Sequence, residues 1–158
     1  MDIRFADESD LPALMALINN AFRVETFFIK GDRLTSDRTR DYFQKGRFLL
    51  GEENGDLAGV VYVELRGDRS YLGMLSVDPA RQKSGLGRRL TLAAEEFARE
   101  MGSHHMDLTV VNVRGELPSY YRNLGYADDG TEPLHDHMLP RITQPCHFLR
   151  MTKHLGNG

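Results

Sequence analysis

The sequence predicts an α/β (α+β) fold with a mixed, mostly antiparallel central sheet of six to seven strands, flanked by about four helices. The first observation is a run of three apolar segments, 47–51, 57–65 and 71–77, that are separated by tight turns. The first of these turns contains Asn54-Gly55, which favours a β-hairpin, so the run predicts an antiparallel meander. The second observation is a strand–helix–strand pattern over 71–111, which predicts a parallel or splayed strand pair joined by a right-handed crossover.

Length and composition favour a single domain over residues 1–158. The chain has 41% hydrophobic residues, enough to form one core, and the single cysteine, Cys146, precludes an intrachain disulfide. A net charge of -3 gives no reason to expect a nucleic-acid partner. The sequence shows neither a signal peptide nor an apolar run of the ~20 residues that a membrane helix needs, so we expect a cytoplasmic protein with no membrane partner.

The first third of the chain predicts one short strand and two helices. Residues 3–5 alternate in polarity and are typical of a short opening strand. Apolar side chains then recur at helical spacing over 11–22 and predict an amphipathic helix. Thr35 or Ser36 can cap a second helix, which we expect to reach about Lys45.

The second half of the chain predicts one long helix followed by shorter elements. Apolar residues from Leu86 to Met101 line one helical face, and Gly102 can end that helix. The remaining expected elements are a buried strand over 106–111, a short helix over 116–123, another strand or extended piece from Tyr126, an irregular stretch over 128–144 and a last strand over 146–151.

The junction between the third meander strand and the long helix carries the clearest chemical signal. An apolar run over 71–77 leads into a short loop that contains Gly85 and Gly87, and this loop opens the helix. Glycines let the backbone approach a ligand, and the free N–H groups and dipole of a helix N-terminus favour negative charge. The junction therefore predicts a site for a phosphate-bearing ligand, with an ordinary strand-to-helix turn as the alternative.

Two motifs resemble those of the GNAT N-acetyltransferases. The loop Gln82-Lys83-Ser84-Gly85-Leu86-Gly87 matches the pattern Gln/Arg-x-x-Gly-x-Gly/Ala of that family. The segment Tyr121-Arg122-Asn123-Leu124-Gly125-Tyr126 resembles the family's Tyr-x-x-x-Gly-Phe/Tyr signature, and the order of elements is similar from about residue 2 to residue 153.

The resemblance implies acetyl-coenzyme A as the donor and an amine as the acceptor. It also implies that the strands around residues 71–77 and 106–111 splay apart, so that the pantetheine arm can pair with the open strand edge. The donor-binding residues that it implies are Leu75, Val77, Gln82, Lys83, Ser84, Gly85, Leu86, Gly87, Arg88 and Asn112. The loop N–H groups would hold the pyrophosphate, and Asn112 would reach the pantetheine arm.

The resemblance also implies a general acid, whereas no motif identifies the base. Tyr121 matches the tyrosine that protonates the departing thiolate in many family members, although the adjacent Tyr120 leaves open which of the two faces the thiol. The attacking amine must be neutral, so a group has to accept its proton. Glu64 and Glu25 are the candidates for that base.

Other chemical signals are weaker. The loop lacks the Gly-Lys-Ser/Thr triplet of nucleotide triphosphatases, and its glycines do not have the spacing of a dinucleotide-binding fold. His104-His105 and His135-Asp136-His137 do not form a convincing ligand set, so we expect no metal. Cys146 is interpreted as a buried small residue rather than a nucleophile.

The acceptor and the assembly remain open at this point. Phe27, Phe28 and the stretch 128–144 could line the acceptor site, although either phenylalanine could simply complete the core. The acceptor could be a small-molecule or a peptide amine, and the acyl group could be longer than acetyl. A non-catalytic acyl-coenzyme A sensor on the same fold is the alternative function. An edge strand near the C-terminus could pair with a second copy, which would give a homodimer.

Overall fold

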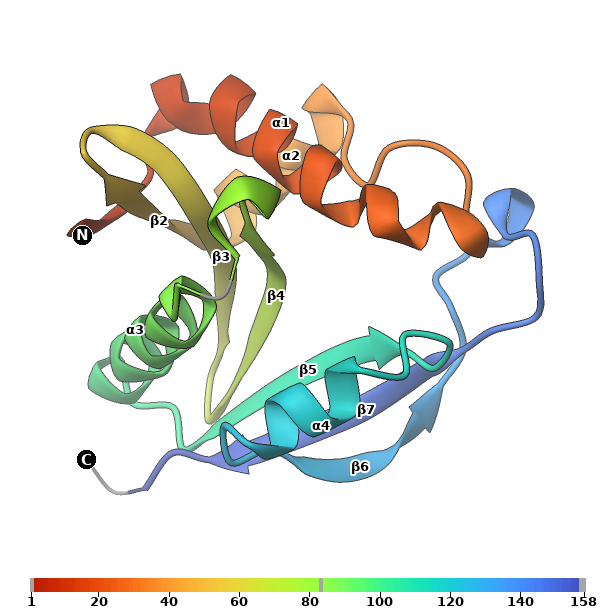
Figure 1. The fold of residues 1–158 in the computed structure, drawn as a ribbon. Coiled ribbons are helices and arrows are strands. Elements are labelled where there is room, and N and C mark those ends of the chain that lie inside the picture. The colour runs from red at the N-terminus through yellow and green to blue at the C-terminus, as the bar shows by residue number, and fades with distance from the viewer. Residues whose placement is uncertain (1, 83, 157–158) are drawn as a thin grey trace.

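The structure, a computed structural model, describes residues 2–82 and 84–156 and contains one seven-stranded sheet (Figure 1). The strands are β1 (Asp2–Phe5), β2 (Arg47–Glu53), β3 (Asp56–Arg66), β4 (Arg69–Val77), β5 (His105–Val111), β6 (Ala127–Glu132) and β7 (Phe148–His154). They lie in the order β1-β2-β3-β4-β5-β7-β6, in which β4 and β5 are parallel and the other neighbours are antiparallel. The predicted mixed, mostly antiparallel sheet is therefore confirmed.

Four α-helices flank the sheet, and local sequence accounts for where they begin. They are α1 (Leu11–Ala21), α2 (Ser36–Lys45), α3 (Leu86–Glu100) and α4 (Leu117–Arg122). The Thr35 hydroxyl accepts a hydrogen bond from the Arg38 N–H, so Thr35 is the N-cap of α2. Pro118 lies in the first turn of α4, where its missing N–H has no helical partner to lose.

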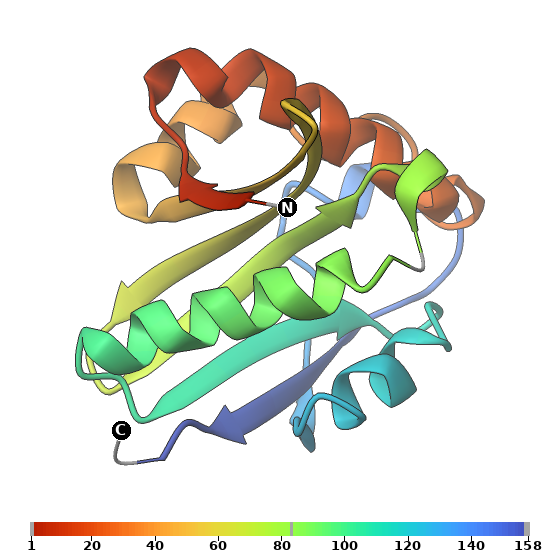
Figure 2. The same ribbon diagram turned by 60° about the vertical axis from the view of Figure 1, so that its left-hand side comes forward.

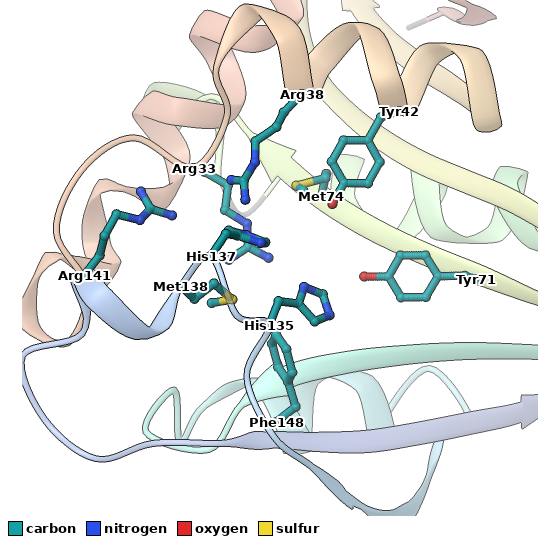
Figure 3. A pocket seen from close by; sticks show the side chains of 10 residues that line it. All are labelled: Arg33, Arg38, Tyr42, Tyr71, Met74, His135, His137, Met138, Arg141 and Phe148. Atoms are coloured by element: carbon teal, nitrogen blue, oxygen red, sulfur yellow. The ribbon is translucent and has the colours of Figure 1, made fainter.

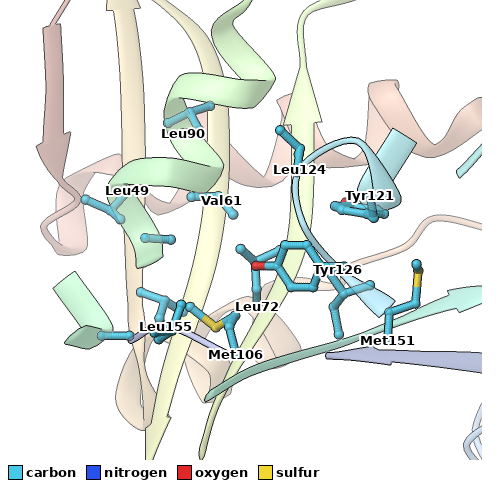
Figure 4. Packing of buried hydrophobic residues seen from close by; sticks show 14 of the residues in the cluster. Leu49, Val61, Leu72, Leu90, Met106, Tyr121, Leu124, Tyr126, Met151 and Leu155 are labelled. Atoms are coloured by element: carbon cyan, nitrogen blue, oxygen red, sulfur yellow. The ribbon is translucent and has the colours of Figure 1, made fainter. Parts of the chain in front are cut away.

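The helices cover opposite faces of the sheet, and each face has its own apolar cluster (Figures 1 and 2). On one face, Leu14 and Ile18 of α1 pack with Val60 and Tyr62 of β3. On the other face, residues of α3 and α4 pack with the strands; Figure 4 shows Leu90, Tyr121 and Tyr126 within this second cluster.

Two glycines let α3 lie close against the sheet. A Cβ atom at Gly51 would come within 2.7 Å of Leu86 Cδ1. At Gly59 it would meet Leu90 Cδ1 at 2.9 Å and the Ser76 carbonyl oxygen at 3.1 Å. Because real side chains do not approach this closely, the absence of a Cβ at these positions fixes the height of α3 above β2 and β3.

Strands β4 and β5 are paired at one end and separate toward the other. The paired residues are Arg69–Tyr71 with His105–Asp107, while β5 stays paired with β7 as far as Val111 and Phe148. The register of β4 against β3 also shifts, because β4 has one extra residue between Gly73 and Ser76. Met74 has a φ of 55°, so this segment is a β-bulge. The splay predicted between 71–77 and 106–111 is therefore confirmed.

Two expectations about the C-terminal third need correction. The stretch 128–144 was expected to be irregular, but its first residues belong to β6 (Ala127–Glu132), an edge strand on β7 that agrees with the strand or extended piece expected from Tyr126. Most of its side chains are exposed, so the sequence carries no apolar alternation that would mark a strand. The last strand was expected from residue 146, but β7 begins at Phe148 and Cys146 lies in the preceding loop.

Candidate functional site

The loop before α3 is built to present backbone N–H groups. Gly85 is the N-cap residue of the 15-residue helix and has a φ of 81°, a left-handed conformation that favours glycine. The first helical bond of this turn runs from the Arg89 N–H to the Gly85 carbonyl, so the N–H groups of Leu86, Gly87 and Arg88 have no acceptor within the helix. These groups and the helix dipole form a site for an anion.

The other expected residues of the loop differ in the solvent exposure of their side chains. Gln82, Ser84 and Arg88 are exposed. The Leu86 side chain is 1% exposed and belongs to the core, so it can offer only its backbone. Lys83 lies outside the described residues.

Leu75 and Val77 lie on the part of β4 that has separated from β5. Their side chains are half-buried and pack against the cluster on the α3 face. The Asn112 side-chain oxygen accepts a hydrogen bond from the His147 backbone N–H at 2.9 Å, and the backbone N–H of Asn112 donates to the His147 carbonyl at 2.9 Å. Asn112 thus extends the β5–β7 ladder by one residue, and its side-chain amide N–H₂ remains available for a ligand.

The two adjacent tyrosines of α4 point to different places. Tyr120 is 37% exposed, and its hydroxyl lies 2.8 Å from where a Cβ of Gly87 would be, so it faces the loop before α3. Tyr121 is 7% exposed; burial raises the pKa of its hydroxyl, with smaller contributions from Tyr120 and Tyr71 and an opposing one from Arg114. Tyr121 instead belongs to the apolar cluster on the α3 face, where its ring packs edge-on against Tyr126 at a centroid distance of 5.8 Å.

Both candidate carboxylates are already bound to cationic groups. The Glu25 carboxylate is 5% exposed, accepts a hydrogen bond from Arg114 at 2.7 Å and lies 3.6 Å from Arg33. Glu64 accepts hydrogen bonds from Tyr62 at 2.7 Å and from Arg66 at 2.5 Å. Burial raises the pKa of Glu64, but these hydrogen bonds outweigh it and the pKa lies below its ordinary value.

A pocket lies on the α1–α2 side of the sheet, beside the splay (Figure 3). It contains about 380 Å³ of space, part of which is open solvent. Its less polar lining comes from Tyr42 of α2, Tyr71 and Met74 of β4, Met138, and Phe148 of β7. Because β4 and β7 lie on the two sides of the splay, the pocket adjoins the gap between them.

The polar lining of the pocket is cationic or basic. It consists of Arg33, Arg38, Arg141, His135 and His137. Figure 3 shows the three guanidinium groups on one side of the pocket and the Tyr71 and Phe148 rings on the other. Among the lining residues that the structure describes, none is acidic.

The stretch 128–144, which the sequence indicated as a possible lining of the acceptor site, supplies His135, His137, Met138 and Arg141 of this pocket. Sequence reasoning did not single out any of these residues for a pocket, weighed the two histidines individually as metal ligands, and missed Arg33 and Arg38. Among the described residues, no group of three or more His, Cys, Asp or Glu side chains could hold a metal ion. Neither phenylalanine of the 27–28 pair lines the pocket: Phe28 is fully buried in a third apolar cluster and Phe27 is 51% exposed.

Comparison with known proteins decides the family. The model of the acetyltransferase (GNAT) family matches residues 11–126, which includes both motifs and the splayed strands. The chain belongs to the GNAT family of acetyltransferases.

Similar proteins include acetyltransferases with small acceptors. The chain is 32% identical to the L-methionine sulfoximine/L-methionine sulfone acetyltransferase of Salmonella typhimurium over 139 residues, covering 80% of each chain. It is 29% identical to the L-amino acid N-acyltransferase MnaT of Escherichia coli over 80% of this chain and 79% of that protein. A streptothricin acetyltransferase of Streptomyces lavendulae is 36% identical over 54% of this chain and 46% of its own length.

Solved structures share the GNAT fold over nearly the whole chain. The yncA protein of Salmonella typhimurium, solved with acetyl-coenzyme A, has a TM-score of 0.76 at 22% identity and covers 99% of this chain and 95% of its own. A ribosomal-protein-alanine N-acetyltransferase of Brucella melitensis has a TM-score of 0.77 at 22% identity, covering 98% of this chain and 99% of its own. Among the described residues, no helix is long and apolar enough to span a membrane.

Proposed function

We propose that this protein transfers an acetyl group from acetyl-coenzyme A directly to the amine of a small molecule. The observation that carries the proposal is the splay between β4 and β5, which has an anion-binding loop on one face of the sheet and a pocket on the other. A donor on one face and an acceptor on the other can meet through this gap. Holding both reactants in place supplies much of the rate of such a reaction.

On the donor face, the chain would bind the coenzyme mainly through its backbone. The N–H groups from Leu86 to Arg88 would hold the pyrophosphate, with Gln82, Lys83 and Ser84 around it. The absence of a side chain at Gly85 would let the pyrophosphate approach the backbone closely. A Cβ atom there would meet no protein atom within 4 Å, but it would strain the left-handed backbone. The open edge of β4 at Leu75 and Val77 would pair with the amide groups of the pantetheine arm, and Asn112 would contact the arm with its side-chain N–H₂.

Direct transfer forms a C–N bond to the acceptor as the C–S bond of the thioester breaks. The sulfur leaves as a thiolate and needs a proton, for which we propose Tyr121. Its burial raises the pKa of the hydroxyl and keeps it protonated, so the hydroxyl is available as a proton donor to the departing thiolate. Cys146 has no part in this scheme, since burial and the nearby Glu25 raise the pKa of its thiol and disfavour a thiolate.

The amine loses its proton to a base, for which Glu25 and Glu64 remain candidates. Glu25 is the better placed of the two, because it contacts Arg33, which lines the pocket. His135 is a third candidate: it lines the pocket directly, and its ring packs on Phe148 beside the splay. Histidine is the commonest general base in enzymes.

The experiment that tests the function has two stages. Calorimetry with acetyl-coenzyme A measures donor binding, and a thiol-release assay with a panel of small amines measures transfer. Donor binding in the micromolar range with amine-dependent thiol release is the expected result. Binding without release for every amine would favour the non-catalytic sensor, and no binding would refute the proposal.

The base is tested through the pH dependence of kcat/KM in three variants, Glu25→Gln, Glu64→Gln and His135→Asn. Loss of the true base should lower kcat/KM by about 100-fold or more and remove the acidic limb of its pH profile. A variant that keeps the wild-type profile removes its residue from the mechanism.

A further inference from the structure

The pocket beside the splay has an unbalanced positive charge. Among residues 2–82 and 84–156, Arg38 and Arg141 make no ion pair with a carboxylate within 4.0 Å. Arg33 has only the longer contact of 3.6 Å to Glu25, and that carboxylate binds Arg114 more closely. Surface arginines of this chain are commonly paired, as Arg40 is with Glu8.

Contacts within the fold fix the positions of the three pocket arginines, Arg33, Arg38 and Arg141. Arg38 lies in the first turns of α2, one turn before Tyr42, so both side chains project from the same side of the helix into the pocket (Figure 3). Arg141 is fixed from behind, because its guanidinium donates to the carbonyls of Lys30 at 3.2 Å and Asp32 at 2.9 Å. Arg33 stacks over the Phe22 ring at 4.8 Å.

The three guanidinium groups are close enough to repel one another. Burial lowers the pKa of Arg141, and the charges of Arg38 and Arg33 lower it further. Like charges gathered in a partly buried site are unfavourable unless a counter-charge joins them. A bound anion would relieve this repulsion, and planar guanidinium groups match the geometry of a carboxylate.

The two sides of the pocket differ in chemical character. The guanidinium groups lie on one side, whereas Tyr71 and Phe148 lie on the side of the splay (Figure 3). An acceptor whose anion binds the arginines would therefore place its remaining atoms toward the gap. Because the arginines and the side chains beside the gap line the same pocket, the anion and the amine would lie near one another in the same small molecule.

We propose that the acceptor carries a carboxylate close to its primary amine, as α-amino acids do, and that Arg38 with Arg33 and Arg141 binds this carboxylate. The inference rests on the proposed function, since it names the substrate class of the same site. The less polar side chains of the lining would contact the acceptor's side chain. A protein N-terminus, which has no carboxylate beside its amine, would be a poor acceptor.

The test compares matched pairs of acceptors on the intact protein. The probes are L-amino acids, including L-methionine and L-methionine sulfone, each paired with its carboxamide, and a short peptide with a free N-terminus and an amidated C-terminus. The carboxamide lowers the pKa of the neighbouring amine, so reactivity alone would favour the amide. We expect kcat/KM for the acid to exceed that for the amide by about tenfold or more, the size of one charge-assisted hydrogen bond.

Two variants of α2 separate the pocket from the rest of the helix. Arg38→Gln should raise KM for the acid by about 10- to 100-fold and change KM for the amide by less than about threefold. Arg38→Lys, which keeps the charge, should restore much of the affinity. Arg40→Gln is the matched control, because Arg40 lies on the same helix, is exposed and pairs with Glu8.

The outcomes distinguish this inference from the proposed function. Acid preference that depends on Arg38 supports it. Thiol release with amides or peptides that equals release with acids, or a KM that Arg38→Gln leaves unchanged, overturns it while acetyl transfer stands. Donor binding without transfer to any amino acid also overturns it. Failure to bind acetyl-coenzyme A overturns both, and unchanged donor affinity in the Arg38 variants excludes misfolding as the cause of a raised KM.

Discussion

A buried carboxylate on α3 ties together three elements around the donor face. Glu95 is 2% exposed and accepts hydrogen bonds from the Tyr126 hydroxyl at 2.9 Å and from Lys153 Nζ at 2.8 Å. Lys153 also donates to the Leu124 carbonyl at 2.8 Å. The network thus links α3 to β7 and to the end of the Tyr-x-x-x-Gly-Tyr segment. We predict that Glu95→Ala is strongly destabilising.

The size of the effect follows from what the substitution leaves behind. Removing one partner of a buried ion pair costs about 3–5 kcal/mol, since the other charge stays buried without compensation. The Lys153 side chain is 21% exposed and keeps the Leu124 carbonyl, so we expect the lower end of that range. A loss of about 3 kcal/mol corresponds to a fall in Tm of about 6–12 °C for a chain of this length.

Urea unfolding and thermal melting measure this loss. Glu100→Ala is the matched control on the same helix, because Glu100 is exposed and its loss should stay within about 0.5 kcal/mol. The double variant Glu95→Leu with Lys153→Met should recover most of the stability, because replacing a buried pair by apolar side chains is often neutral. A cost below about 1 kcal/mol for Glu95→Ala at an unchanged m-value would refute the reasoning.

Three further predictions concern the donor face and pH. Tyr121→Phe should lower kcat by about 100-fold or more with donor affinity little changed, whereas Tyr120→Phe should leave kcat within a few fold; equal effects would remove Tyr121 as the acid. Gly85→Val should weaken acetyl-coenzyme A binding by about tenfold or more. Gly55→Val is the control, because Gly55 is a hairpin glycine of similar φ, so the substitution strains the backbone without affecting donor binding. Unchanged donor affinity in Gly85→Val would contradict the loop assignment. Folding lowers the pKa of Glu64, so the ionised carboxylate stabilises the fold at pH values above its unfolded pKa. This stabilisation is lost as the pH falls through the folded pKa. The difference in unfolding free energy between wild type and Glu64→Gln should therefore shrink between about pH 6 and pH 3.

The fold and the loop before α3 could be predicted because their signals are local. The hairpin between β2 and β3 requires left-handed residues, and Asn54 and Gly55 adopt φ values of 54° and 83°. The loop before α3 requires another at Gly85. Such requirements act within a few residues of the chain, so the sequence displays them directly. The extent of β6 beyond residue 127 was missed for the opposite reason, since its pairing with β7 rather than its side chains makes it a strand.

The pocket beside the splay could be predicted only in part, through the stretch 128–144, because its other parts come from distant segments. Arg38 lies on a helix whose other charged residues face solvent, and its place in the first turns gives no indication that it faces a pocket. His135 and Arg141 belong to a stretch without periodicity, which is held in place by contacts such as the Ile29–Ile142 bridge. Only the folded chain brings these cations together on one side of the sheet.

The structure also explains why the Tyr-x-x-x-Gly-Tyr segment extends beyond its catalytic candidate. Gly125 has a φ of 99°, and a Cβ there would come within 3.0 Å of Lys153 Cε, so the glycine both turns the chain and leaves room for the lysine. That lysine and Tyr126 converge on Glu95 of α3. Gly125 and Tyr126 therefore help to hold α4 against α3, the helix that begins at the Gly85 loop. Their substitution should disturb both helices at once, because the position of Tyr121 and that of the loop depend on the same buried carboxylate.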